Sequence, residues 1–186
     1  MLTRERVLEI FQRSGALLKG HFRLRSGLHS EHFLQSAVVL QYPEYASALC
    51  AELASRVKVD RVDIVIGPAI GGVILAYEVA RALDARAMFG EKNGDGMTLR
   101  PGFEIRPTDR IVVVDDVLTT GGSVSKLIAL SKKHGAQVVS AAFLIDRAAT
   151  DIDFGVPKVA LAKLDITTYT AEACPMCKAN QPLVEP

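Results

Sequence analysis

The stretch IVVVDDVLTTGGS, residues 111–123, decides the fold of this chain. Its four β-branched residues predict a buried strand, and the glycines and hydroxyl side chains that follow open a helix. A helix N-terminus with such residues binds anions, because its unpaired N–H groups and its dipole point at the ligand. The stretch is neither a Walker loop nor the dinucleotide-binding G-x-G-x-x-G.

Two adjacent carboxylates, Asp115 and Asp116, lie between the predicted strand and helix. They would repel a nearby phosphate unless they face sugar hydroxyls or a magnesium ion. The alternative, in which they only cap the sheet edge and the helix, leaves two costly carboxylates without a partner. The stretch therefore predicts a site for a phosphorylated sugar.

The rest of the chain alternates between helices and strands. Apolar strands alternating with helices predict an α/β fold with a mainly parallel twisted sheet covered on both faces, and ligands bind beyond its C-terminal strand ends. The predicted helices span 3–13, 43–57, 71–83 and 120–135, and the predicted strands span 62–67, 85–90, 111–116, 137–147 and 158–166. Residues 16–40 are expected to be irregular or β. Residues 92–110 are expected to form a long mobile hairpin or loop, too polar and broken to pack in the core.

Composition excludes several classes of protein. The 186 residues are 49% hydrophobic and 23% charged with a net charge of +1, which predicts one globular domain and gives no electrostatic case for a nucleic-acid or membrane partner. No apolar run approaches the roughly 18–20 residues that span a bilayer. The N-terminus lacks the apolar segment of a signal peptide, so we expect a cytoplasmic protein.

A second glycine-rich turn, GPAIGG at residues 67–72, joins the strand VDIVIG to the helix 71–83. Glycines here would permit close backbone approach and a positive φ. Alone the turn is weak support for a ligand site, since ordinary tight turns look the same. The prediction of a ligand site is strengthened because this turn lies one strand–helix unit before the acidic stretch.

The acidic stretch resembles the signature of type I phosphoribosyltransferases, which bind phosphoribosyl pyrophosphate (PRPP). The resemblance implies that Asp115 and Asp116 bind the ribose hydroxyls and that Val117, Leu118, Thr119, Thr120, Gly121, Gly122 and Ser123 form the loop around the 5′-phosphate. It implies that the turn with Ile70 and Gly71 holds the pyrophosphate, and that Mg²⁺ is a cofactor held mainly by PRPP, with no metal ligands from the protein. One domain, 1–186, would comprise a core of about 43–166 and a small hood from about 1–40 and the C-terminal tail.

The segment FRLRSGLHSEHF, residues 22–33, resembles the N-terminal signature of the orotate phosphoribosyltransferase family, in its short bacterial and archaeal branch. Orotate is a flat anion, so its site needs a cation and an apolar face. Arg25, Phe33 and Leu34 could supply part of this. By resemblance, Arg147 and Thr119 are expected to contact orotate, the first as a bidentate carboxylate clamp. The alternatives are a solvated edge-strand charge for Arg25 and an ion pair with Asp146 or Asp151 for Arg147.

Residues 91–103 resemble the catalytic lid of the same family, which reaches over the active site of a neighbouring subunit. Lys92 matches the lysine at the base of that lid, and Arg100 is the only other nearby cation. The Lys and His at the lid tip of the longer enzymes are not recognisable, which leaves the identity of the lid's catalytic cation open. The resemblance implies a homodimer with shared active sites, and Gly94, Gly96 and Gly102 would allow the lid to close.

Two rival functions share much of this pattern. A purine-type phosphoribosyltransferase has a similar acidic stretch, but a neutral purine needs no carboxylate clamp such as Arg147. A regulator that senses PRPP without catalysis usually needs a nucleic-acid-binding module, and 186 residues leave little room for one. We therefore predict transfer of the phosphoribosyl group from PRPP to orotate, in pyrimidine biosynthesis.

The cysteines and histidines carry a weaker signal. Cys50 fits a small core residue in an apolar helix. Cys174 and Cys177 form a C-x-x-C with no second pair and no obvious helix after it, so we interpret them as incidental thiols in a tail turn. A metal site shared between subunits and a disulfide are the alternatives. His21, His29 and His32 raise the alternative of a zinc site, but they lack helical spacing, so structural or interface roles are expected.

Overall fold

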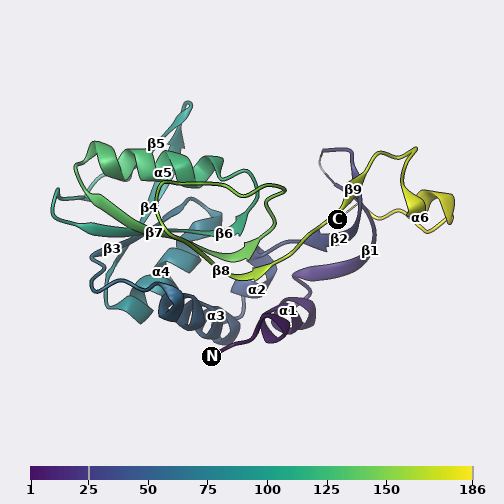
Figure 1. Cartoon of the computed structure of the whole chain (residues 1–186), viewed down its shortest axis with the longest axis horizontal. Helices are drawn as coiled ribbons and strands as arrows, with labels where there is room; N and C mark the ends of the chain where they lie inside the picture. The colour runs from purple at the N-terminus through teal and green to yellow at the C-terminus, as the bar shows by residue number, and fades with distance from the viewer. Residues whose placement is uncertain (25, 186) are drawn as a thin grey trace.

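The computed structural model describes residues 1–24 and 26–185, which leaves Arg25 outside the described residues. A six-stranded sheet forms its centre (Figure 1). In spatial order its strands are β5 (Gly96–Leu99), β4 (Arg86–Asn93), β3 (Ile64–Pro68), β6 (Arg110–Leu118), β7 (Gln137–Asp146) and β8 (Lys158–Lys163). All neighbouring strands are parallel except β5, which runs antiparallel to β4. The predicted mainly parallel α/β sheet is confirmed.

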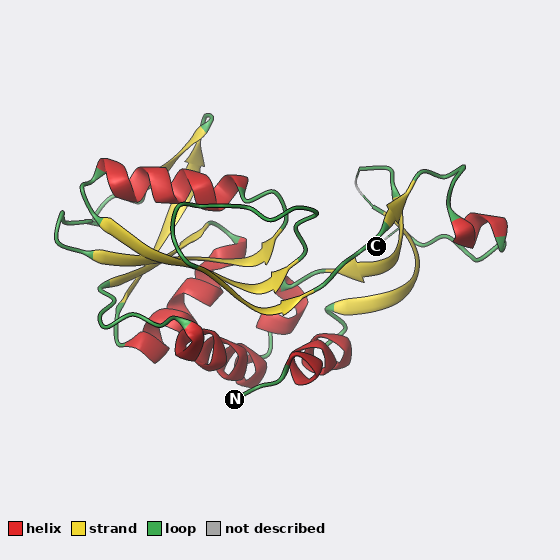
Figure 2. Ribbon diagram, in the orientation of Figure 1, coloured by secondary structure: helices red, strands yellow, loops and turns green. Residues whose placement is uncertain are grey.

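Helices cover both faces of this sheet (Figure 2). Helices α3 (Pro43–Arg56) and α4 (Gly71–Leu83) pack on one face, and α5 (Gly122–Lys133) packs on the other. Successive residues of β6 therefore enter different cores, since side chains alternate across a strand. Val112 and Val114 belong to the cluster under α3 and α4, whereas Ile111 and Val113 belong to the cluster under α5. This double coverage explains the uninterrupted apolar run.

The N-terminal and C-terminal segments meet in a separate three-stranded sheet beside the central one, which we call the hood (Figure 1). Its strands are β1 (Leu17–Arg23), β2 (His29–Leu34) and β9 (Thr168–Tyr169), and the short helix α6 (Pro175–Lys178) follows β9. Helices α1 (Arg4–Arg13) and α2 (Ala37–Leu40) flank the hood strands in sequence but bury Val7, Phe11 and Val39 in the central core. Within the described residues, no helix has the length and apolar character needed to cross a membrane.

The segment 92–110 is a hairpin, as predicted, but the expectation that it stays out of the core is wrong. Strand β4 continues to Asn93 and turns back through β5, because Gly94 adopts φ +54° in the turn. Beyond the hairpin, Phe103 packs edge-on against Phe89, with ring centroids 5.2 Å apart, and Ile105 is buried under α5. These scattered apolar residues show no regular period, so the sequence pattern did not reveal their packing.

Candidate active site

The acidic pair lies at the C-terminal edge of the central sheet. Strand β6 extends through Leu118, two residues past the predicted end, so Asp115 and Asp116 are consecutive strand residues. Asp116 adjoins the 67–72 turn: a Cβ built on Gly71 would lie 3.8 Å from its Oδ2. Asp115 instead lines a small depression with residues 117–124. Each of the two carboxylates thus lies beside a different one of the two predicted loops.

Burial makes this pair electrostatically costly. It raises the pKa of Asp115 to about 7, with the neighbouring Asp116 charge as the second cause, and burial also raises the pKa of Asp116. Each carboxylate accepts one backbone N–H: Asp116 N–H donates to Asp115 Oδ1 at 3.0 Å, and Val117 N–H donates to Asp116 Oδ1 at 2.8 Å. Carboxylates with raised pKa values in a concave site are typical of functional positions.

The loop after β6 turns sharply into α5. Thr119 and Thr120 are exposed, and Gly121 takes φ +71° at the helix N-cap. Gly121 is also required sterically, because a Cβ there would lie 2.8 Å from the ring of Phe154. No side chain caps the N-terminus of α5, so its first N–H groups face the depression lined by Asp115 and residues 117–124. The arrangement suits an anionic ligand.

The 67–72 turn requires glycine at positions 67 and 72 because neighbouring atoms approach the backbone closely there, and not because φ is positive. A Cβ on Gly67 would lie 2.4 Å from the carbonyl oxygen of Gly72, and a Cβ on Gly72 would lie 2.6 Å from Pro68. The expected positive φ is wrong for this turn, since none of its three glycines adopts one. The Ala69–Ile70 peptide bond is cis, and Ile70 is 88% exposed at the start of α4.

Arg147 follows β7 and lies beside the acidic edge. Its backbone N–H donates to Leu118 O at 2.9 Å, and its side chain lines a pocket with Asp165, Ile166 and Thr167. The alternative ion pairs with Asp146 and Asp151 are absent from the described structure, because Lys158 binds both carboxylates at 3.5 and 2.7 Å. The guanidinium is thus available for a ligand.

The two cations of the β4–β5 hairpin differ in their surroundings. Arg100 forms an ion pair with Glu91 of the opposite strand at 2.5 Å. Lys92 is exposed, and the described chain offers it no ion pair. The hairpin projects from the body of the molecule beside α5 (Figure 1). Lys92 is therefore the freer cation of this segment.

Phe33 and Leu34, two of the residues expected to contact the base, lie in the hood strand β2. Phe33 pairs with Phe22 at 5.8 Å between ring centroids, whereas Leu34 packs against the central core. Neither is brought into contact with the acidic pair, and Arg25 lies outside the described residues. Sequence reasoning missed Phe154, which packs against Gly121 in the loop after β6, and Lys158, which forms ion pairs with Asp146 and Asp151. Neither residue belongs to a local motif.

Cys174 and Cys177, interpreted from the sequence as incidental thiols of a tail turn, have neighbours that the sequence did not predict. Both cysteines are free, and they lie against His21 and His29 of the hood strands. Cys177 lies in α6, a helix that the sequence pattern did not predict. The structure brings together two of the three histidines for which structural or interface roles were expected; the two hood histidines and the C-x-x-C pair are 145 to 156 residues apart in sequence.

Comparison with known proteins places this fold and site in a class. Residues 42–154 match the family described as phosphoribosyl transferase domain, and this range includes both glycine turns and the acidic pair. The orotate phosphoribosyltransferases of Pelotomaculum thermopropionicum and Caldanaerobacter subterraneus are 48% and 50% identical over 185 residues, covering 100% of this chain and 97% of each relative. The chain belongs to the orotate phosphoribosyltransferase family.

Solved structures agree with this assignment. Orotate phosphoribosyltransferase from Aeropyrum pernix superposes with a TM-score of 0.71 at 28% identity, covering 85% of this chain and 93% of that one. Adenine phosphoribosyltransferase from Thermoanaerobacter pseudethanolicus gives a TM-score of 0.61 at 21% identity, covering 72% and 88%. The second likeness concerns the fold alone, so the base must be argued from the site.

Proposed function

We propose that this protein transfers the phosphoribosyl group of PRPP to orotate, giving orotidine 5′-monophosphate and pyrophosphate in pyrimidine biosynthesis. The observation that carries the proposal is the buried Asp115–Asp116 pair, which ends β6 directly before the uncapped N-terminus of α5. The relatives named orotate phosphoribosyltransferase support the choice of base.

Each part of PRPP has a matching group at the sheet edge. The ribose hydroxyls donate hydrogen bonds to Asp115 and Asp116, which offsets the cost of burying two carboxylates. Residues 119–123 bind the 5′-phosphate through backbone N–H groups and hydroxyls. The 67–72 turn binds the pyrophosphate, next to Asp116.

Orotate is recognised through its carboxylate. The Arg147 guanidinium, which has no ion pair in the described structure, forms a bidentate pair with it. The Arg147 backbone N–H donates to Leu118 O, and this contact beside the acidic pair supports an acceptor base that binds near the sugar. Thr119 is exposed at the same edge and supplies a hydroxyl.

Catalysis in this proposal rests on positioning and charge neutralisation. Displacement at the anomeric carbon passes through a loose, oxocarbenium-like state and needs no protein nucleophile. The carboxylate oxygens at the site are hard donors that suit Mg²⁺. Mg²⁺ held mainly by PRPP, with Asp115 and Asp116 nearby, would supply positive charge to neutralise the pyrophosphate leaving group. Lys92 adds positive charge when the hairpin closes and excludes water.

We propose a homodimer in which the β4–β5 hairpin serves the partner's site. Ile70, Ile74 and Tyr77 are 88%, 49% and 62% exposed, and their spacing places them on one side of α4 beside the pyrophosphate turn. A contiguous exposed apolar surface of this kind is typical of a protein interface. If Arg100 contributes to the partner's site, it must first break its ion pair with Glu91.

The test replaces the acidic pair by Asp115→Asn with Asp116→Asn. Turnover, followed by orotate absorbance with PRPP and Mg²⁺, should fall by at least about 100-fold, since the ribose contacts are lost. Circular dichroism should show a folded protein. Retained turnover would refute the role of the pair.

The wild-type protein tests the identity of the base. Consumption of orotate but not adenine in the presence of PRPP is expected. Transfer to adenine, or calorimetric binding of PRPP without transfer to either base, would overturn the proposed function in favour of a purine enzyme or a sensor.

A further inference from the structure

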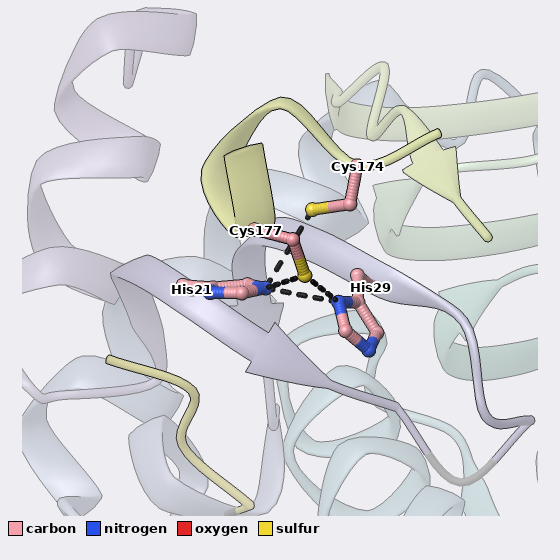
Figure 3. Close-up of side chains that lie close together, drawn as sticks. All are labelled: His21, His29, Cys174 and Cys177. Carbon is pink, nitrogen blue, oxygen red and sulfur yellow. Dashed lines mark hydrogen bonds between the residues drawn. The ribbon is translucent and has the colours of Figure 1, made fainter. Parts of the chain in front are cut away.

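Four side chains with metal-ligating atoms converge in the hood, away from the acidic edge (Figure 3). They are His21 of β1, His29 of β2, Cys174 before α6 and Cys177 within it. Their Nε2, Nδ1 and two Sγ atoms all lie within 4.8 Å of one another, and three of the four residues are buried. The labelled side chains point toward a common centre in Figure 3.

The separations fit a tetrahedral ion. Zn–N bonds of about 2.0–2.1 Å and Zn–S bonds of about 2.3 Å give tetrahedral edges of about 3.4 Å between nitrogens and about 3.6 Å between nitrogen and sulfur. His21 Nε2 lies 2.9 Å from His29 Nδ1 and 3.6 Å from each cysteine Sγ. Cys177 Sγ lies 3.2 Å from His29 Nδ1. A shift of a few tenths of an ångström would admit the ion.

The outer contacts orient one ligand for metal binding. His21 Nδ1 lies 3.0 Å from the backbone carbonyl oxygen of Gln181, which accepts a hydrogen bond from that nitrogen. A proton on Nδ1 leaves the Nε2 lone pair directed at the cluster. Histidine ligands of metals are commonly held by such a hydrogen bond from the other ring nitrogen.

The hood buries few apolar side chains of its own, so a cross-link would stabilise it. Phe22 and Met176 are buried there, yet neither belongs to the two central hydrophobic clusters. A small apolar contact set of this kind stabilises a substructure poorly, and metal ions often replace the missing core. The cluster joins the β1–β2 hairpin to the C-terminal segment, which also pairs with β1 through Val184.

We propose that His21, His29, Cys174 and Cys177 bind one Zn²⁺ ion in a closed structural site that fixes the C-terminal segment to the hood. Two thiolates and two imidazoles are a ligand set that zinc prefers, and four protein ligands leave no open position for catalysis. The site is distinct from the Mg²⁺–PRPP chemistry proposed above and does not depend on it.

Metal analysis of the full-length protein tests the proposal directly. The protein is purified without an affinity tag or chelator, and metal is quantified by mass spectrometry. About one zinc per chain is expected. Replacement by Co²⁺ should give the intense visible bands of a tetrahedral site and thiolate-to-cobalt charge transfer. Removal by a chelator should lower Tm, and added Zn²⁺ should restore it.

Matched variants locate the site. Cys177→Ser, whose side chain is partly exposed, and His29→Asn should lose the zinc and the charge-transfer signal or weaken it strongly. Cys50→Ala and His32→Asn, which remove the same residue types outside the cluster, should retain one zinc. None of these readouts requires enzyme activity, so failure here is separable from failure of the proposed function.

Two results would overturn the proposal. One is wild-type protein that holds no zinc as purified and takes up none when Zn²⁺ is added to the reduced chain. The other is a Cys174–Cys177 disulfide found by alkylation and mass spectrometry in freshly purified protein. Because both are measured on the wild-type chain, they remain decisive even if the variants fail to fold.

Discussion

The fold holds the Asp115 carboxylate in a buried position that disfavours its charge. The residue proposed to bind the ribose therefore also lowers the stability of the unliganded protein. Its pKa is raised to about 7 by burial and by Asp116, above the ordinary value of 3.8. The folded state therefore binds more protons than the unfolded state between those pH values. The contribution of Asp115 to the stability of the free protein should therefore fall as pH rises through that window.

Asp115→Asn should therefore stabilise the unliganded protein while it weakens PRPP binding. The amide keeps an oxygen that can accept the Asp116 N–H but carries no charge. At pH 8 we expect a Tm about 3 °C above wild type, equivalent to about 1 kcal/mol, and a smaller difference at pH 5. Thermal scans at both pH values check this. A Tm that falls equally at both would show that the carboxylate stabilises the fold.

At the scale of elements, local signals predicted the strand–helix units, whereas the hood was expected only from the family resemblance and its shortest elements were not predicted. Helix α4 has the predicted bounds because its apolar period and flanking glycines are local signals. The acidic pair was predictable for the same reason, since strand, carboxylates and helix start follow one another. Helix α2, strand β9 and helix α6 have four, two and four residues, too few for a period to show. Contacts between distant segments stabilise them.

The turn between β3 and α4 allows a test of whether steric contacts in the turn require glycine. Gly67→Ala places a Cβ 2.4 Å from a backbone oxygen that cannot rotate away. Overpacking of this kind costs about 1–3 kcal/mol, so Tm should fall by about 3–10 °C. Gly71→Ala is the matched control, because its Cβ meets only the Asp116 carboxylate at 3.8 Å. Its Tm should equal or exceed wild type, since alanine favours a helix. Equal losses in both variants would contradict the explanation.

At the scale of the whole molecule, the separation of Lys92 from Arg147 in the sheet supports the proposed homodimer with shared sites. In the sheet, β3 and β6 lie between the strand that carries Lys92 and the strand that precedes Arg147. The hairpin projects outward beside α5 (Figure 1). A site that needs both cations is completed most simply by a hairpin from a second copy. Exposed apolar side chains on α4 offer a surface for that copy.

Mixed dimers test this sharing. Lys92→Ala and Arg147→Ala should each be nearly inactive alone. Co-expressed with two different tags and equal in amount, they form hybrids in which one of the two sites regains both cations. Random pairing then restores about one quarter of wild-type activity per chain, and doubly selected hybrids restore about one half. Hybrids of wild type with either variant calibrate the assay. Hybrids as inactive as their parents would show that Lys92 and Arg147 act within one chain, because only action across the interface can rescue one defect with the other.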